Sequence, residues 1–458
     1  MQKPSIPRGT RDFGPQQMAK RNYIFNTIKA VYQKFGFSQL ETPTLENLSV
    51  LTGKYGDEGD QLLFKVLNSG DFLSKTSEDD YKAGSKALLN KVSEKGLRYD
   101  LTVPFARYVV MNRNDITFPF KRFQIQPVWR ADRPQKGRYR EFYQCDADVV
   151  GTNSLLCEAE IIVMINEVFE NLNLENFTIK INNRKILQGF TEVIGAPGKE
   201  TELCVAIDKL DKIGKEKVIE ELENNGFDAE NLKKLDPIFS IGSDLQANLE
   251  FLEGFFTDCE IGKEGLKETK EILTYLEAFD LQDSHLELDI TLARGLSYYT
   301  GSIFEVKANG VKIGSICGGG RYDNLTGVFG LKDVSGVGIS FGVDRIYDVL
   351  EELELFPASS DSDLQVVIVN FGEETQSASI KLLSSLRAAS INAELYPDAS
   401  KMKKQMTYAN KRNVPFVIVI GEDEIKSGEY VLKNMLDGNQ ENLSPESIIS
   451  TIKDNLKS

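Results

Sequence analysis

The chain has 458 residues, of which 41% are hydrophobic and 27% charged, and its formal net charge is −15. This composition is typical of a globular protein with two to four domains, and the absence of a long apolar run or a signal-peptide core predicts a cytoplasmic protein without membrane contact. Five cysteines without C-x-x-C spacing argue against a zinc site or other metal site, and the single histidine, His285, excludes chemistry that depends on a histidine base.

A helix is predicted from Pro15 to Phe35. Apolar residues recur on one face, proline suits the first turn, and Gly36 follows as a terminator. The next segment, 37–45, has the composition of a strand but contains Pro43. That proline predicts a sheet edge or a bulge at this point.

Residues 68–96 are polar, with few apolar positions, and are expected to form a mobile insertion. After them, residues 98–103 are predicted to form a short strand. In a strand, Asp100 and Thr102 would lie on the same side, because side chains alternate with a period of two.

Residues 121–148 are predicted to form two strands joined by a basic loop. Alternation places mostly polar side chains of both strands on one face: Arg122, Gln124, Gln126 and Arg130 from the first, and Arg140, Gln144, Asp146 and Asp148, with Phe142, from the second. A solvated face would explain this pattern in an ordinary hairpin. However, the loop from Arg130 to Arg140 holds five cations and one acid in an acidic chain, which favours a floor for an anionic ligand.

An apolar-periodic helix is predicted from about Glu158 to Leu172, followed by a strand with the sequence FTIKIN. Residues 199–282 are rich in Lys, Glu and Leu and are predicted to be a helical block inserted between strand-rich segments. Strand patterning resumes at Leu286 and continues to the glycine-rich stretch 313–342.

Three segments within this region could surround a ligand. Residues 294–301, RGLSYYTG, and residues 318–323, GGGRYD, are interpreted as polar loops in which glycines permit a close approach of the backbone; a turn or a hinge is the alternative. Residues 340–345, SFGVDR, are interpreted as a strand that leads into a helix. Arg345 would then lie in the first turn, where it could bind a phosphate or form a surface ion pair.

The composition changes to that of a linker at 357–363. Beyond it, continuous apolar strands alternate with helices, which predicts a small α/β domain with a parallel sheet. One of its helices, 401–412, contains five cations and no acid, and a basic helix on an acidic protein suits contact with an RNA backbone, although a solvated face is the alternative.

Taken together, these segments resemble the motifs of class II aminoacyl-tRNA synthetases, and most closely those of the histidyl-tRNA synthetase family. The resemblance rests on PRGTRDF, ETPTLE, WRADRPQKGRYREFYQ, RGLSYYTG, GGGRYD and GISFGVDR, and it spans nearly the whole chain. It implies an α+β fold: an antiparallel-sheet catalytic domain in residues 1–198 and 283–357, a helical insertion in 199–282, and an α/β anticodon-binding domain in 358–458.

The resemblance also implies an activity: ATP-dependent conversion of histidine to histidyl-adenylate, then transfer of histidine to the 3′ end of tRNA(His), with Mg²⁺ as cofactor and a homodimer as the assembly. Catalytic roles are implied for Arg130 and Arg294. The implied ATP ligands are Arg130, Asp132, Arg138, Phe142 and Arg345. The implied histidine ligands are Asp100, Thr102, Gln144, Asp148, Arg294, Tyr299 and Tyr322. The implied tRNA contacts are Gln135, Lys136, Lys401 and Lys404.

Two points remain open at this level. Many relatives carry Asp at the position of Ser297, which leaves that contact undefined. A related alternative function is that of a non-catalytic paralog, the regulatory subunit of ATP phosphoribosyltransferase. Such paralogs usually lack the anticodon domain and several motif residues, and this chain retains both.

Overall fold

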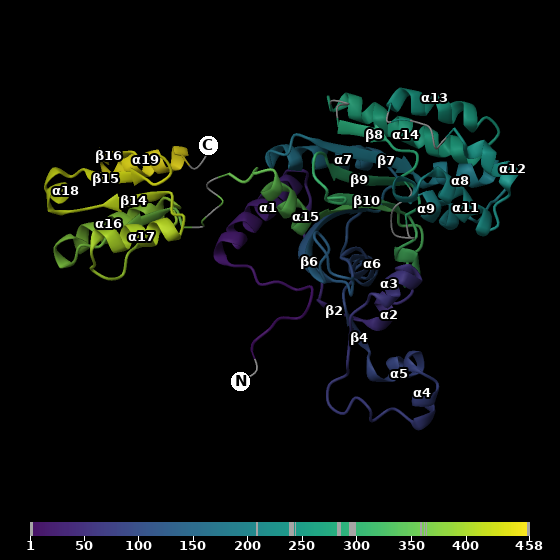
Figure 1. Ribbon diagram of the computed structural model, residues 1–458, viewed down its shortest axis with the longest axis horizontal. Helices are drawn as coiled ribbons and strands as arrows, with labels where there is room; N and C mark the ends of the chain where they lie inside the picture. Colours follow the sequence, from purple (N-terminus) through teal and green to yellow (C-terminus); the bar gives the residue numbers. More distant parts are fainter. Residues whose placement is uncertain are drawn as a thin grey trace. The chain divides into compact units, whose positions relative to one another are not determined.

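The computed structural model describes residues 3–207, 209–237, 242, 244–281, 285–292, 299–357, 360, 362 and 364–455 (Figure 1). The chain forms two compact units, Met1–Arg11 with Ile24–Leu355, and Asp12–Tyr23 with Phe356–Ser458. Within the described parts of the chain, no helix has the length and apolarity required to cross a membrane.

A large mixed sheet forms the centre of the first unit. Its described strands run in the order β1 (Ser38–Gln39), β5 (Phe120–Trp129), β6 (Glu141–Val150), β11 (Gly336–Gly342), β10 (Cys317–Tyr322), β9 (Ser302–Ala308), β7 (Phe177–Asn183) and β8 (Leu286–Leu288). Neighbours pair antiparallel, except for β1 with β5 and β7 with β8. The predicted hairpin and the strand FTIKIN are therefore confirmed. The prediction of a loop at 318–323 is wrong, because most of this segment is strand β10.

One face of this sheet is apolar and covered by helices. Helix α7 (Leu156–Asn171) places Phe169 against Phe177 and Phe341, with ring centroids 5.1 and 5.5 Å apart. Tyr32, from α1 (Pro15–Lys34), donates a hydrogen bond to the carbonyl oxygen of Cys145 at 2.6 Å. The opposite face carries the polar side chains of the hairpin, so covering the apolar face leaves the polar face available for a site.

A small sheet of β2 (Leu45–Asn47), β4 (Lys95–Leu97) and β3 (Lys65–Val66) lies beside short helices in the same unit. These helices are α2 (Leu48–Leu51), α3 (Gly56–Gln61), α4 (Glu78–Lys82) and α5 (Ser85–Val92). The segment 37–45 thus contributes to two strands in different sheets, β1 and β2, with Pro43 between them. The insertion 68–96 has defined structure, and Ser77 and Asp80 form a capping box at the start of α4.

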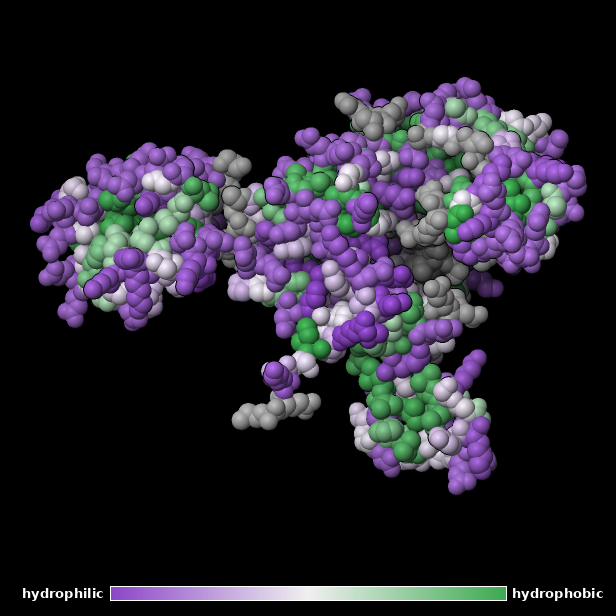
Figure 2. Space-filling view, viewed as in Figure 1, coloured by the Kyte–Doolittle hydropathy of each residue, from purple (hydrophilic) through white to green (hydrophobic). Residues whose placement is uncertain are grey.

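The insertion exposes apolar side chains. Figure 2 shows hydrophobic residues gathered over the part of the chain that carries α4 and α5. The exposed members include Leu67, Phe72, Leu73 and Tyr81.

The predicted strand at 98–103 is also wrong, because helix α6 (Thr102–Met111) begins inside it. Pro104 occupies the first turn of α6, where the missing N–H of proline costs no intrahelical hydrogen bond. The backbone N–H of Val103 donates to Asp100 Oδ1 at 3.1 Å. Asp100 therefore lies at a helix start, where a carboxylate satisfies a free N–H donor.

A helical block occupies most of 184–278, in agreement with the prediction of helices. Its elements are α8 (Arg184–Val193), α9 (Glu200–Ile207), α10 (Leu210–Ile213), α11 (Lys215–Asn224), α12 (Ala229–Leu232), α13 (Leu245–Phe255) and α14 (Glu260–Ala278). Glycines allow close packing here: a Cβ at Gly262 would lie 2.4 Å from the Phe256 ring. His285 stacks on Phe177 at 4.2 Å beside the start of β8, which agrees with the structural role expected for it.

The second unit contains a sheet in the order β13 (Ala393–Leu395), β12 (Val366–Ile368), β14 (Phe416–Val419), β15 (Tyr430–Asn434) and β16 (Gln440–Leu443). Its helices after residue 364 are α16 (Glu373–Ala388), α17 (Met402–Lys411), α18 (Glu422–Ser427) and α19 (Pro445–Asn455). The first three strands are parallel, as predicted, whereas β15 and β16 add an antiparallel hairpin that the sequence analysis missed.

Candidate functional site

The polar floor predicted for the hairpin is present. In the antiparallel register of β5 and β6, Arg122 lies opposite Asp148 and Gln124 lies opposite Asp146. On the other side of β6, Ser340 of β11 lies opposite Asp146. Directly opposed residues project to the same side of a sheet, so these polar groups share one face.

A first cavity of about 230 Å³ opens over the outer part of this floor. Arg130 lies at its base, where its Nε donates to the carbonyl oxygen of Tyr99 at 3.0 Å. The Arg130 guanidinium carbon lies 4.2 Å from the centre of the Tyr99 ring and 5.2 Å from that of Phe142. The two rings restrict the arginine to a narrow range of positions.

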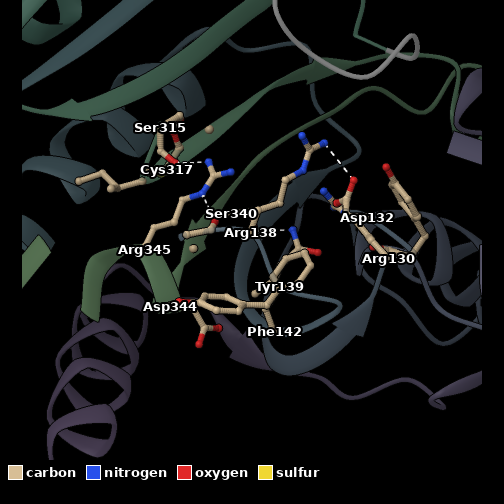
Figure 3. Close-up of a pocket in the computed structure, with 16 residues that line it drawn as sticks. Arg130, Asp132, Arg138, Tyr139, Phe142, Ser315, Cys317, Ser340, Asp344 and Arg345 are labelled. Carbon is tan, nitrogen blue, oxygen red and sulfur yellow. Dashed lines mark hydrogen bonds and ion pairs between the residues drawn. The ribbon is translucent and has the colours of Figure 1, made fainter. Parts of the chain in front are cut away.

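Two further arginines line the same cavity (Figure 3). Arg138 pairs with Asp132 at 3.0 Å, and Asp132 is buried while Arg138 is half exposed. Arg345, in the first turn of α15 (Val343–Glu352), donates to the carbonyl oxygens of Gly137 at 2.9 Å and Ser315 at 2.6 Å. The cavity is therefore lined by guanidinium groups from three separate positions in the chain, which is the arrangement that suits an extended polyanion.

The loop between β5 and β6 is held in place by its own backbone. Gln135 and Arg138 exchange two backbone hydrogen bonds, of 3.1 and 2.9 Å, across a turn in which Gly137 has a φ of +70°. Lys136 forms an exposed ion pair with Glu352 of α15 at 2.7 Å. Gln135 and Lys136 thus lie on the exposed side of the loop, whereas Arg138 faces the cavity.

The N-terminal segment supports this loop and α15. The backbone N–H of Arg140 donates to the carbonyl oxygen of Gly9 at 2.9 Å. Arg11 pairs with Asp344, and its guanidinium carbon lies 3.3 Å from the centre of the Tyr139 ring. These contacts connect the segment PRGTR to both sides of the cavity.

A second cavity of about 170 Å³ adjoins the first. It is lined by Asp100, Thr102, Asp148, Tyr299, Gly338 and Ile339, and by four residues that also line the first cavity: Arg130, Gln144, Gly318 and Ser340. The shared residues make the two cavities parts of one site. A ligand that filled both would have its junction beside Arg130.

The lining of the second cavity contains buried acceptor atoms. Within the described part of the chain, Asp100 Oδ2 and Gln144 Oε1, which line this cavity, and Asp146 Oδ1, which does not, are buried and receive no hydrogen bond. Gln144 instead uses its Nε2 to donate to Ser340 Oγ at 2.7 Å, which directs its oxygen away from that serine. Buried acceptors are normally satisfied, so this set indicates a place for a ligand that supplies several N–H donors.

Asp148 is held from two sides. The Tyr322 hydroxyl donates to Asp148 Oδ1 at 2.6 Å, and Arg122 Nη2 lies 2.6 Å from Asp148 Oδ2. Burial raises the pKa of the Asp148 carboxyl, whereas Arg122 and the Tyr322 hydroxyl act to lower it. The ion pair with Arg122 and the hydrogen bond from Tyr322 therefore both favour the ionised form of Asp148.

Burial also dominates the titration of the other acids. It raises the pKa of Asp100, which the Val103 N–H and Arg130 partly offset. It raises the pKa of Asp146 to about 7, with Arg122 acting to lower that value and Asp148 to raise it further. Carboxyl groups with strongly raised pKa values cluster at functional sites.

Most of the residues implied by the sequence lie around these two cavities. Asp132, Arg138, Phe142 and Arg345 line the first, Asp100, Thr102, Asp148 and Tyr299 line the second, Arg130 and Gln144 line both, and Tyr322 contacts Asp148. Arg294 and Ser297 lie outside the described residues. Lys401 and Lys404 belong to the second unit.

Four residues were not assigned to the site from the sequence. Tyr99 restricts Arg130, Ser340 receives the Gln144 hydrogen bond, Asp146 adds a third buried acid, and Arg122 pairs with Asp148. Arg122 and Asp146 were placed on the correct face by strand alternation, and that alternation is the signal that could have identified them.

Comparison with known proteins agrees with this geometry. The family model described as "Histidyl-tRNA synthetase" matches residues 71–346, and the model described as "Anticodon binding domain" matches residues 365–455. A histidine–tRNA ligase of Cytophaga hutchinsonii is 57% identical over 449 residues, covering 98% of this chain and 99% of that protein. The histidine–tRNA ligase of Christiangramia forsetii is 56% identical over 454 residues, covering 99% and 100%.

Solved structures show the same relationship. The crystal structure of a histidyl-tRNA synthetase from a Nostoc species superposes with a TM-score of 0.85 at 32% identity, covering 99% of this chain and all of that one. A Bacillus halodurans structure described as an ATP phosphoribosyltransferase regulatory subunit/histidyl-tRNA synthetase has a TM-score of 0.72 at 23% identity, covering 91% and 99%. At that identity the second comparison supports the fold alone.

Proposed function

The chain belongs to the histidyl-tRNA synthetase family, and on that premise we propose how its residues carry out the activation step of histidine–tRNA ligation and where they contact the tRNA. The activity is that of a histidine–tRNA ligase: histidine is activated by ATP and then attached to tRNA(His). We assign roles to the residues from two adjoining cavities. Arginines line the first cavity, unsatisfied acceptors line the second, and Arg130 and Gln144 line both.

ATP would occupy the first cavity. Arg130 would bind the α-phosphate, because it lies where the two cavities meet. Arg345 and Arg138 would bind the outer phosphates, and Phe142 would stack on adenine, with Asp132 near the edge of the base. A guanidinium presents a planar fork of donors that matches phosphate oxygens, so arginines at fixed positions suit this ligand.

Histidine would occupy the second cavity. Its α-ammonium carries three N–H donors, which suit the unsatisfied oxygens of Asp100 and Gln144 in the lining of this cavity, with Thr102 beside them. Its imidazole ring would lie against Asp148, Tyr299 and Tyr322. An apolar side chain in this position would leave the Asp148 carboxylate and the tyrosine hydroxyls unpaired, which is the physical basis for rejecting other amino acids.

The chemical step needs positioning and charge neutralisation. One carboxylate oxygen of histidine attacks the α-phosphorus, the bond from that phosphorus to the bridging oxygen breaks, and pyrophosphate leaves with the electron pair. The histidine carboxylate is already ionised, so no general base is required, which agrees with a chain that contains a single histidine. Arg130, with Arg294 as proposed from the motif RGLSYYTG, would neutralise charge on the α-phosphate as the bond order changes.

Magnesium would enter with the ATP. The described residues contain no group of three or more His, Cys, Asp or Glu able to hold a metal ion. Mg²⁺ commonly binds substrate phosphates and water with few protein ligands, so the outer phosphates beside Arg345 are its expected place. There it would supply positive charge to the leaving pyrophosphate.

Two partners complete the proposal. Lys401 and Lys404 at the start of α17, together with Gln135 and Lys136 in the hairpin loop, are proposed contacts to tRNA(His), and all four side chains are exposed. We also propose a homodimer, supported by the exposed apolar side chains of Leu45, Leu67 and Phe72 near the segment ETPTLE. Light scattering at twice the 51.3 kDa of the chain would support the dimer, and a monomer at micromolar concentration would contradict it.

The regulatory-subunit alternative predicts a protein without activation chemistry. Exchange of pyrophosphate into ATP that depends on histidine separates the two functions in one assay. We expect exchange by the wild-type protein, and a loss of about a hundredfold to a thousandfold or more in kcat for Arg294→Ala with a modest change in histidine affinity. Wild-type kcat in the Arg294→Ala protein would refute the role given to this residue.

A further inference from the structure

Arg122 lies in the sheet directly beneath the histidine cavity and has no exposed surface. Its Nη2 lies 2.6 Å from Asp148 Oδ2, and its Nη1 donates to Gln124 Oε1 at 3.3 Å. It lines neither cavity. Burying an arginine removes its charge from water at a large cost in free energy. An arginine buried beneath a ligand pocket is therefore expected to have a function there.

The remaining contacts of Arg122 fix the orientation of its guanidinium group. Nη2 also donates to the carbonyl oxygen of Leu101 at 3.4 Å, and the guanidinium carbon lies 4.2 Å from the centre of the Phe105 ring. Leu101 and Phe105 belong to the start of α6, the same element that follows Asp100. The guanidinium is thus held between the floor and α6, with Asp148 as its ion-pair partner.

Contacts on the other side of Asp148 also restrict the position of its carboxylate. Tyr322 donates to Asp148 Oδ1, and Gly338 of β11 lies so close that an added Cβ would lie 2.1 Å from that oxygen. A carboxylate oxygen accepts more than one hydrogen bond, so each oxygen of Asp148 can still receive a donor from a ligand.

Two acids, two arginines and three tyrosines lie around Asp148. The charged and titratable groups that face it come from every neighbouring element: Arg122 and Arg130 of or beside β5, Asp146 of β6, Asp100 before α6, Tyr322 of β10, Tyr299 before β9, and Tyr32 of α1. Arg122 is the cation in direct contact with Asp148. Without it, burial and the neighbouring acids would favour the protonated carboxyl.

We propose that Arg122 is a positioning residue that keeps Asp148 ionised and oriented as the acceptor for a ring N–H of histidine, and thereby sets the recognition of the imidazole. The inference rests on the proposed function, because it assumes that the ring of histidine lies against Asp148. It assigns to Arg122 no contact with either substrate.

The consequence is that histidine binding depends on pH more strongly when Arg122 is absent than in the wild-type protein, where Asp146 still titrates near pH 7. In an Arg122→Met protein, Asp148 would lose the cation that favours its ionised form. A larger fraction of the carboxyl would then be protonated and would present a hydroxyl where an acceptor is needed. Raising the pH would ionise it and restore the acceptor. The wild-type protein carries the ion pair, so its histidine affinity would change less over the same pH range, by the part that comes from Asp146.

The test is histidine-dependent pyrophosphate exchange measured from pH 7 to 8.5 with L-histidine and ATP each varied. For Arg122→Met we expect the KM for histidine to rise about tenfold or more at pH 7 and to recover toward the wild-type value at pH 8.5, with the KM for ATP changed less than about twofold. Arg122→Lys keeps the charge and should restore most of the histidine affinity. A loss of affinity that is equal at every pH, or a KM for ATP that rises as much as that for histidine, would overturn the proposal.

A second variant covers the case in which Arg122→Met does not fold, since one member of a buried ion pair is left alone. Arg122→Met combined with Asp148→Asn removes both charges, and its KM for histidine should equal that of Asp148→Asn alone, because Arg122 acts through Asp148. A further loss in the double variant would overturn the inference. Absence of exchange in the wild-type protein would instead refute the proposed function, so the two failures are distinguishable.

Discussion

At the scale of single residues, the site is defined by acids that burial forces toward the neutral state. Asp146 is the clearest case, because it lies between Gln144 and Asp148 on β6 and its pKa is raised to about 7. The main cause is desolvation, and the negative charge of Asp148 adds to it. Asp146 therefore changes its charge near physiological pH.

The raised pKa of Asp146 predicts a dependence of stability on pH. Between about pH 4 and 7, Asp146 holds a proton in the native protein, whereas the same side chain in the unfolded protein has released it. The contribution of Asp146 to the free energy of unfolding therefore falls as the pH rises, by up to about 1.4 kcal/mol per pH unit. Asp146→Asn does not titrate and should remove this decline. Urea unfolding of both proteins at pH 5 and pH 7.5 measures it.

If the two proteins lose the same free energy of unfolding between these pH values, the Asp146 carboxyl does not carry the raised pKa. A smaller loss in the Asp146→Asn protein is the expected result. Relative to the wild-type protein, the Asp146→Asn protein should be more stable at pH 8 than at pH 5. The reason is that the wild-type protein bears a buried negative charge at pH 8.

Residues whose place depends on local pattern could be predicted from the sequence. Arg130, Arg138 and Arg345 each lie at the end of a predicted strand, loop or helix, and all three line one cavity. The part played by Tyr99 could not be predicted, because its backbone carbonyl and ring meet Arg130 only after α6 and β5 come together. Long-range packing of this kind leaves no local signal in the sequence.

At the scale of elements, the floor depends on the close approach of β6, β11 and β10. Gly319 of β10 lies opposite Ile339 of β11, and an added Cβ there would lie 2.1 Å from the Gly338 carbonyl oxygen. Three successive glycines favoured a loop in the sequence analysis. In the structure they belong to strand β10. Glycine is required at Gly319 and Gly320 because the neighbouring backbone leaves no room for a Cβ atom.

The close approach at Gly338 yields a second prediction. Gly338→Ala would push its Cβ into the Asp148 carboxylate and the Ala147 carbonyl, so Asp148 must move. We expect the KM for histidine to rise about tenfold or more, because a displaced carboxylate no longer meets the ring. Steady-state exchange kinetics would measure this rise.

Gly327→Ala is a matched control for this change. No atom lies within 4 Å of an added Cβ at Gly327, and its φ is not in the left-handed region. Its KM for histidine should remain at the wild-type value. An unchanged KM in Gly338→Ala as well would show that the position of Asp148 does not govern histidine binding.

Two other elements differ from the sequence-based expectation for identifiable reasons. Residues 98–103 alternate like a strand, but Pro104 suits a first helical turn, and α6 begins at Thr102. The β15–β16 hairpin was missed although Asp437-Gly438 is a strong turn signal, and Gly438 has a φ of +79°. In both cases a turn or cap residue was more informative than the apolar pattern.

At the scale of the whole molecule, the two units are proposed to divide the work. Activation needs the cavities of the first unit, whereas the second unit carries the basic helix α17. Lys401 and Lys404 are exposed, and Lys404 lies 6.0 Å from the centre of the Tyr396 ring. Tyr396 itself is buried, so the exposed lysines would contribute through the charge of the RNA backbone.

Charge reversal at these lysines tests the division. Lys401→Glu with Lys404→Glu should raise the KM for tRNA(His) about tenfold or more in aminoacylation, since two phosphate contacts are lost and two repulsions are added. Histidine-dependent pyrophosphate exchange should be unchanged. Lys426→Glu on α18, where the side chain is 72% exposed, is the control and should alter neither value.

Loss of exchange activity in the Lys401/Lys404 double variant would contradict the separation of roles. An unchanged KM for tRNA(His) would remove α17 from the proposed interface.

In the proposed mechanism, one floor holds both substrates, with Arg130 at their junction. A crystal structure with a non-hydrolysable analogue of histidyl-adenylate would show whether this is so. We expect the phosphate mimic within hydrogen-bonding distance of the Arg130 guanidinium, adenine stacked on Phe142, and the imidazole against Asp148. An analogue bound elsewhere, or bound here with Arg130 turned away from the phosphate mimic, would contradict this mechanism.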